Sequence, residues 1–173
     1  MIKRVSILGI LALTLTAVET ALLSALGLGG GFYLSLGVLL VAAARAGDIE
    51  GAVVAAIIGY GWDLFSGLPV GMSVAPAVAI LVVVRVLSQG VEIAGFLQLF
   101  ILGALCAVLH GACCLGMIVV SGSAVDLSKW YSLGAIVRQG IMAALVAPPV
   151  FALGEWLDKM LVKERGELEV WLS

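Results

Sequence analysis

The amino-acid sequence predicts an all-α, polytopic membrane protein, and two observations support this fold class. The 173 residues are 63% hydrophobic and only 12% charged, with a mean hydropathy of +1.24. A soluble domain of this length needs far more polar surface to cover its core. In addition, apolar runs of membrane-spanning length recur from one end of the chain to the other. The net charge of -2 comes without a basic patch, which argues against binding to nucleic acid.

The hydropathy pattern predicts six transmembrane spans joined by short loops. In order, they are Val5–Leu26, Phe32–Ala46, Gly51–Phe65, Ser73–Leu87, Gly95–Val120 and Ser132–Leu157. The second, third and fourth are shorter than the roughly 20 residues that a bilayer requires. A re-entrant segment is therefore the alternative interpretation of the third span. Together the six spans make residues 1–157 one transmembrane domain.

Local features mark individual spans. The first is longer than the core of a cleavable signal peptide, roughly 7–15 residues, so we expect it to be retained as a helix. Pro76 lies early in the fourth span, where its missing N–H costs least. Pro148 and Pro149 lie deep in the sixth span and are expected to kink or break it. The charged residues 158–173 predict an amphipathic or disordered cytoplasmic tail, in which Gly166 is expected to end the helix.

The distribution of positive charge predicts that both termini face the cytoplasm. With that orientation the inner side holds Lys3, Arg4, Arg45, Arg85, Lys159, Lys163 and Arg165. The outer side keeps only Lys129 outside the apolar core, which agrees with the positive-inside rule.

The tryptophans give a second indication of the membrane boundaries. Trp62 and Trp130 fall near the predicted outer boundary, and Trp156 and Trp171 fall at or beyond the inner one. Indole rings favour the headgroup depth because one edge is polar and the rest is apolar. Simple core packing is the alternative interpretation.

Two charged residues lie inside the predicted spans and are expected to pair. Glu19 is about seven residues from the outer end of the first span, roughly 10 Å deep. Arg138 is about six residues into the sixth span, roughly 9 Å deep. Because charge in hydrocarbon is costly, we expect a Glu19–Arg138 ion pair, with Asp63 as the competing or third partner. Thr16, Glu19, Thr20 and Ser24 share a helical face that should turn toward the bundle.

Thiol and imidazole side chains in the fifth span could in principle bind a soft metal ion. Cys106, His110, Cys113 and Cys114 share one face of that helix. One helix rarely completes four-coordination, and no other span supplies a histidine or cysteine. We therefore expect no metal and no cofactor, with the cysteines packed as small apolar residues and His110 in an interhelical hydrogen bond. No catalytic triad, paired intramembrane carboxylates or phosphate-binding loop is evident either, so no enzymatic activity is expected.

The most specific segment is the turn between the third and fourth spans. It reads Gly59-Tyr60-Gly61-Trp62-Asp63-Leu64-Phe65-Ser66-Gly67-Leu68-Pro69-Val70-Gly71-Met72. Glycines supply positive φ and proline fixes φ, so Ser66, Gly67, Pro69 and Gly71 are typical of a tight turn. Asp63 lies near the outer end of its helix, where a carboxylate can reach water or a partner's donor. The alternative is a helical hairpin whose acid caps neighbouring amides.

This motif resembles the MreD family, the small polytopic subunits of the bacterial rod-shape system. The matching positions are Gly59, Asp63, Ser66, Gly67, Pro69 and Gly71. The resemblance covers about fifteen residues in motif and the whole chain in architecture. It implies the bacterial inner membrane as location and a fold similar to the substrate-binding subunits of energy-coupling-factor transporters. It also implies as partners a single-span MreC-like protein, and RodA with its transpeptidase in the same complex.

Two functions follow from this resemblance. The first is a non-catalytic scaffold of the elongasome that binds MreC and helps regulate sidewall peptidoglycan synthesis and rod shape. A groove between spans, lined by small residues, would hold the partner together with polar groups near the outer face, including Asp63 and the Ser66–Gly71 turn. Membrane lipids would contact the remaining surface. The alternative is a small-molecule, vitamin-type substrate-binding subunit of a membrane transporter. Such a subunit requires a midplane cavity, which Thr16, Glu19, His110 and Arg138 would line.

Overall fold

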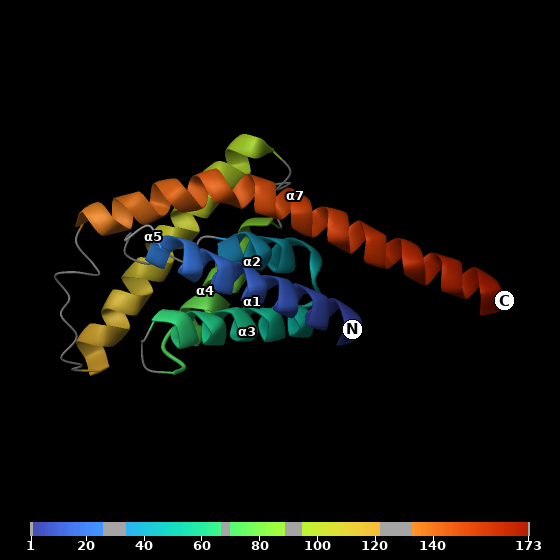
Figure 1. The fold of residues 1–173 in the computed structure, drawn as a ribbon, viewed down its shortest axis with the longest axis horizontal. Helices are drawn as coiled ribbons and strands as arrows, with labels where there is room; N and C mark the ends of the chain where they lie inside the picture. Colours follow the sequence, from blue (N-terminus) through green and yellow to red (C-terminus); the bar gives the residue numbers. More distant parts are fainter. Residues whose placement is uncertain (1, 26–33, 67–69, 89–94, 122–132, 173) are drawn as a thin grey trace.

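The computed structural model describes residues 2–25, 34–66, 70–88, 95–121 and 133–172. These residues form helices and no strand, which confirms the all-α prediction. The helices are α1 (Ile2–Ala25), α2 (Leu34–Arg45), α3 (Asp48–Ser66), α4 (Val74–Ser88), α5 (Phe96–Ser121) and α7 (Leu133–Leu172) (Figure 1). Each coincides with one of the predicted spans, and most ends agree within about three residues.

Within the described ranges, three helices are long and apolar enough to cross a bilayer. Their spanning segments are Val5–Ala25, Phe96–Met117 and Val137–Leu157. By contrast, α2 has 12 residues and α4 has 15. At 1.5 Å per residue these two rise only about 18 and 22 Å, against a hydrocarbon core of about 30 Å. The membrane character of the chain is therefore supported, while six crossings and the orientation of the termini stay predictions.

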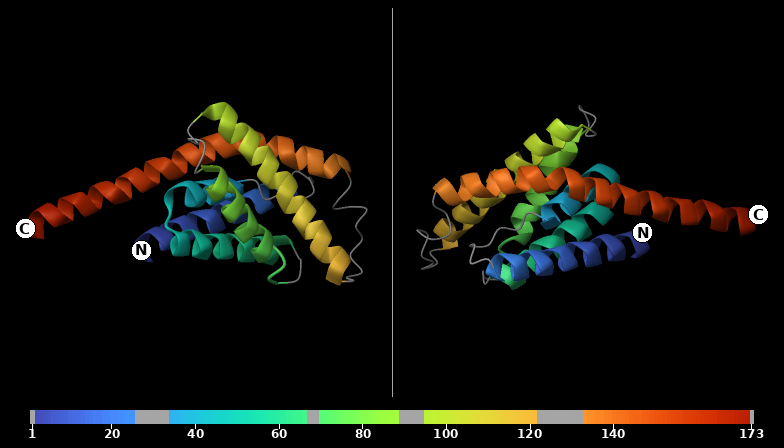
Figure 2. Two further views of the ribbon diagram at one scale, coloured as in Figure 1. Left: turned by 180° about the vertical axis from the view of Figure 1, so that it is seen from behind. Right: turned by 45° about the horizontal axis from the view of Figure 1, so that its top comes forward.

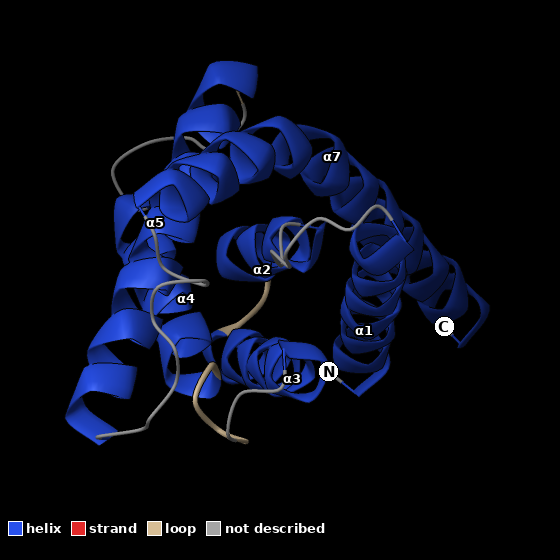
Figure 3. Ribbon diagram, turned by 60° about the vertical axis from the view of Figure 1, so that its left-hand side comes forward, coloured by secondary structure: helices blue, strands red, loops and turns tan. Residues whose placement is uncertain are grey.

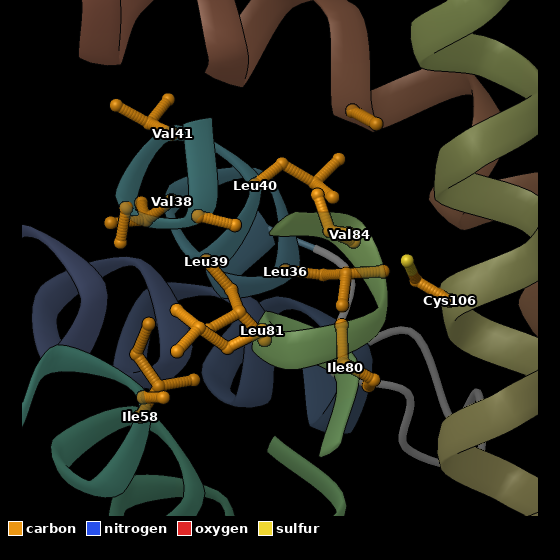
Figure 4. Close-up of a cluster of buried hydrophobic side chains, with 14 of the residues drawn as sticks. Leu36, Val38, Leu39, Leu40, Val41, Ile58, Ile80, Leu81, Val84 and Cys106 are labelled. Carbon is orange, nitrogen blue, oxygen red and sulfur yellow. The ribbon is translucent and has the colours of Figure 1, made fainter. Parts of the chain in front are cut away.

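The short helix α2 lies in the middle of the bundle, with the other helices around it (Figure 3). It packs against α1, α3, α4, α5 and α7. All its residues from Ser35 to Ala43 are buried. Figure 4 shows Leu36 and Leu39 of α2 beside Ile80 and Leu81 of α4 in this core. A helix that is apolar on all sides is expected where protein surrounds it completely.

Glycines bring α7 close to its neighbours. A methyl group added at Gly37 of α2 would lie 2.6 Å from Val150 of α7, and one at Gly154 would lie 2.6 Å from Val41. In α5, a methyl group at Gly103 would lie 2.7 Å from Ala147. Because leucine gains little from burial against leucine in lipid, such close backbone approach is a principal means of holding membrane helices together.

The longest helix, α7, continues well beyond its membrane-spanning segment. Its 40 residues correspond to about 60 Å. The ribbon changes direction near its middle, and its C-terminal part runs away from the other helices (Figures 1 and 2). Pro148 and Pro149 lie inside the helix, which continues through both, and Val150 and Gly154 pack closely against α2 just beyond them. The prediction that Gly166 ends the helix is wrong. One glycine costs a helix only about 1 kcal/mol, and good helix formers flank it.

Candidate functional site

Asp63 joins the end of α3 to the beginning of α4. Its carboxyl group is buried, with the residue only 2% exposed. Atom Oδ2 accepts a hydrogen bond from the Gly71 N–H at 2.6 Å, and Oδ1 accepts one from the Ser73 N–H at 2.8 Å. These amides lie at the positive end of the α4 dipole, where a negative charge is stabilising. The geometry therefore matches the capping interpretation of this acid.

The amino end of α4 needs this side chain from another helix. Ser73 is the N-cap residue, because its carbonyl accepts the first helical hydrogen bond, from the Ala77 N–H at 3.0 Å. A serine at this position normally caps the amide three residues on, but that residue is Pro76, which has no N–H. Accordingly, the buried Ser73 Oγ has no hydrogen-bond partner within the described part of the chain. Asp63 instead holds the amides of Gly71 and Ser73, which lie just before the first helical residue, Val74.

Backbone geometry requires glycine at two positions of the same motif. A methyl group at Gly59 would lie 2.6 Å from the Val74 Cα and 2.7 Å from the Ser73 carbonyl oxygen. Gly71 has a φ of 96°, which side-chain-bearing residues rarely adopt. The positive φ expected of this turn is thus confirmed at Gly71. Gly67 and Pro69 lie outside the described residues, and of Ser66 only the backbone is described.

Glu19 of α1 performs a similar task for α2. The residue is 4% exposed, and its Oε2 accepts a hydrogen bond from the Leu34 N–H at 3.1 Å. Leu34 is the first residue of α2, so this carboxylate also lies at the amino end of a short helix. Thr16 is buried on the same face of α1, as predicted, and its hydroxyl donates to the Ala12 carbonyl. Thr20 is partly buried, but the prediction that Ser24 also faces the bundle is wrong, because it lies exposed at the end of α1. Arg138 is an exposed residue of α7, and its ion pair with Glu19 stays a prediction.

Trp62 of α3 lies in the core, where it contacts α2 and α5. It is 1% exposed, and its indole N–H donates to the Ser35 Oγ of α2 at 2.6 Å. Its ring also meets the His110 ring of α5 edge to face, with centroids 4.5 Å apart. The burial of Trp62 matches the alternative interpretation of core packing, because α2 carries a hydroxyl that satisfies the indole inside the bundle, and its depth in the membrane stays a prediction. The His110 Nε2 lies 3.6 Å from the Cys114 Sγ one turn along the same helix.

Buried polar groups therefore gather at one end of the bundle, which we call the capped end. It comprises Glu19, Ser35, Trp62, Asp63 and His110. Four helices contribute to it, and its two carboxylates accept hydrogen bonds from backbone amides. The capped end fixes where α2 and α4 begin.

The opposite ends of these helices form the charged end, where basic and acidic side chains meet. Arg45 at the end of α2 pairs with Glu155 of α7, whose carboxylate also lies 3.7 Å from the Lys159 Nζ. Arg85 at the end of α4 pairs with Asp48 at 2.6 Å. Three basic residues predicted to share one side of the membrane thus lie at one end of the bundle.

An open apolar groove runs between the first half of α4 and the last half of α5. Its volume is about 520 Å³. One wall consists of Met72, in the turn before α4, and of Ala75, Pro76 and Ala79 of α4. The other wall consists of Cys113, Gly116, Met117 and Val120 of α5. Met72 belongs to the turn that Asp63 holds, so the capped end also fixes one wall of the groove.

The amino-acid sequence predicts a groove between spans but does not show which spans form it. Its signal is the small residues Ala75, Ala79 and Gly116, yet such residues recur throughout an alanine- and glycine-rich chain. In a membrane protein both buried and lipid-facing positions are apolar, so hydropathy does not separate them. Only the packing of α4 against α5 identifies which small residues face outward.

The polar atoms of the capped end are bonded to the chain's own backbone and side chains, and the groove is lined by apolar side chains. Within the described ranges, no three His, Cys, Asp or Glu side chains are placed to hold a metal ion. No protein-family model, curated protein or solved structure matches the chain.

Proposed function

We propose that this chain is a non-catalytic membrane scaffold of the bacterial elongasome. In this role it binds an MreC-like single-span protein and helps regulate sidewall peptidoglycan synthesis and rod shape, with RodA and its transpeptidase in the same complex. It lies in the inner membrane as six transmembrane segments with both termini in the cytoplasm. The resemblance of the Gly59–Met72 segment to the MreD family supports this proposal.

The observation that carries the proposal is the open apolar groove between α4 and α5. A transmembrane helix that binds in lipid needs close packing, because burying apolar surface gives little gain there. Ala75 and Ala79, one turn apart on α4, leave room for such packing. The MreD-like motif lies directly beside this groove, and Asp63 determines where the α4 wall begins.

This geometry gives the motif a mechanical role in partner binding. The Asp63 carboxylate fixes the turn, the turn fixes Met72, and Met72 begins the α4 wall of the groove. Loss of the carboxylate would free the turn that leads into α4 and so change the shape of the groove wall that begins at Met72. Binding of the partner then depends on Asp63 although its side chain is buried and does not touch the partner.

No observation favours the transporter alternative as a second candidate. Of the residues predicted to line a substrate cavity, Thr16 donates to its own helix and Glu19 accepts from the amino end of α2. The groove between α4 and α5 is open and lined by apolar side chains, so it is not the polar midplane chamber that a transporter subunit needs.

Co-purification tests the proposed function. The full chain would be co-expressed with an MreC-like single-span protein and purified through a tag on one of the two. We expect the pair to elute together, and we expect Ala75→Leu, which fills the groove, to reduce the recovered partner by about tenfold. Ala152→Leu is the matched control, because Ala152 is an exposed alanine of α7 away from the groove. A wild-type chain that elutes without the partner would refute the proposal.

A further inference from the structure

Gly116 has no steric reason to be glycine within the described part of this chain. A methyl group added there would meet no described atom within 4 Å. Methyl groups added at Gly37, Gly103 or Gly154 would lie 2.6 or 2.7 Å from a neighbouring helix. Gly116 lies well inside α5, where glycine is less favourable than alanine. The isolated fold therefore explains the other three glycines and leaves this one unexplained.

The position of Gly116 connects it with the groove. It belongs to the α5 wall and faces Ala75 and Ala79 across the groove. On one side the lining runs from Met72, just before α4, to Ala79 of α4, and on the other it covers residues 113–120, about two turns of α5. Two turns are about 11 Å, which matches the 10–12 Å diameter of a single helix with its side chains. The groove therefore has the length needed to seat one crossing helix.

We propose that the occupant of the groove is a single transmembrane helix whose backbone passes close to Gly116 and which carries a small residue at that crossing. This inference rests on the proposed function, which states that the groove binds a single-span protein. It adds the point of closest approach and the chemistry of the partner surface. A helix backbone is rigid and needs the space that a methyl group would fill. A lipid acyl chain rearranges around such a methyl group and gives no reason for glycine.

The test uses two synthetic transmembrane peptides, so that it does not depend on the identity of the partner. One is a leucine-rich helix with a central Gly-x-x-x-Gly, and the other has leucine at both glycine positions. Each labelled peptide is incorporated into phosphatidylcholine vesicles with the labelled full chain, and association is measured by energy transfer. We expect the glycine-bearing peptide to bind roughly tenfold more tightly than the leucine peptide. In Gly116→Ala this preference should disappear.

The matched control is Gly140→Ala. Gly140 lies in α7, and a methyl group there would meet Val108 at 3.7 Å, an ordinary contact outside the groove. Both variants should leave the melting temperature of the isolated chain unchanged or raised, since each replaces a helical glycine without a clash. Only Gly116→Ala should lose the peptide preference. The same substitution thus leaves the fold intact and weakens association, which separates binding from misfolding.

Each other outcome overturns the inference. If neither peptide binds, or if both bind equally, a helix is not recognised at Gly116. If Gly116→Ala changes only self-association of the labelled chain, the occupant is a second copy. If it changes only the amount of co-purified phospholipid, the occupant is an acyl chain. Should the peptides behave as expected while the MreC-like protein fails to co-purify, the groove inference stands and the proposed function fails.

Discussion

The two ends of the bundle handle charge in different ways. At the capped end, Glu19 and Asp63 are buried. Glu19 accepts a hydrogen bond from the first amide of α2, and Asp63 accepts two from the turn that leads into α4. At the charged end, Arg45 and Glu155 pair with each other while the Arg45 side chain stays 50% exposed. A buried amide that loses its acceptor has no water to replace it, whereas an exposed ion pair is exchanged for water at little cost. The capped end should therefore determine the fold, and the charged end should only adjust it.

The largest effect is expected from Asp63→Ala. This substitution leaves the buried Ser73 amide and the more exposed Gly71 amide without their acceptor, and hydrogen bonds to a charged group contribute about 1.5–3 kcal/mol each. We expect the free energy of unfolding in detergent to fall by about 3 kcal/mol. Asp63→Asn keeps one acceptor oxygen and should lose about half as much. An Asp63→Ala protein as stable as wild type would contradict the capping role.

Gly59→Ala is expected to have the next largest effect. The added methyl group would lie 2.6 Å from the Val74 Cα, and backbone at the start of α4 has little freedom to move. Overpacking of this kind costs about 1–3 kcal/mol. Gly116→Ala is the control, because a methyl group at this helical position would meet no described atom within 4 Å. It should leave the melting temperature unchanged or slightly raised. Equal melting temperatures for the two variants would show that α3 and α4 are not held in close contact at Gly59.

A double-mutant cycle on Glu19 and Arg138 tests whether the capped end extends to α7. Glu19→Gln, Arg138→Gln and the double variant would be unfolded under the same conditions. If the predicted ion pair forms, the two changes should be coupled by about 1 kcal/mol or more. Additive effects would limit Glu19 to capping Leu34 at the start of α2.

The smallest effect is expected at the charged end. Arg45→Ala removes the ion pair with Glu155, but because the Arg45 side chain is half-exposed, the loss should be about 0.5 kcal/mol. Raising the salt concentration should shrink the difference from wild type further. If this loss were as large as that of Asp63→Ala, the distinction between the two ends would be wrong.

Several features of the fold were predictable because hydrophobicity and turn chemistry are local. Apolar runs bounded by charges and glycines located the helices, and the positive φ of Gly71 followed from the turn. The role of Trp62 was not predictable, because its partner Ser35 comes from another helix and the same indole would suit a headgroup region. Glu19 was expected to meet an arginine. The cap that it supplies to Leu34 depends on where α2 begins, which hydropathy does not define.

By itself, the amino-acid sequence determined that the chain is helical and apolar, where its helices lie, and which segment carries an acid beside a glycine-rich turn. Tertiary structure decided the rest: that α2 is enclosed by other helices, that two acids cap the short helices, and that Ala75 and Gly116 face one groove. The physical reason is that lipid and protein interior are both apolar. Residue type therefore tells whether a position avoids water, and only packing tells whether it faces a neighbouring helix or the surface.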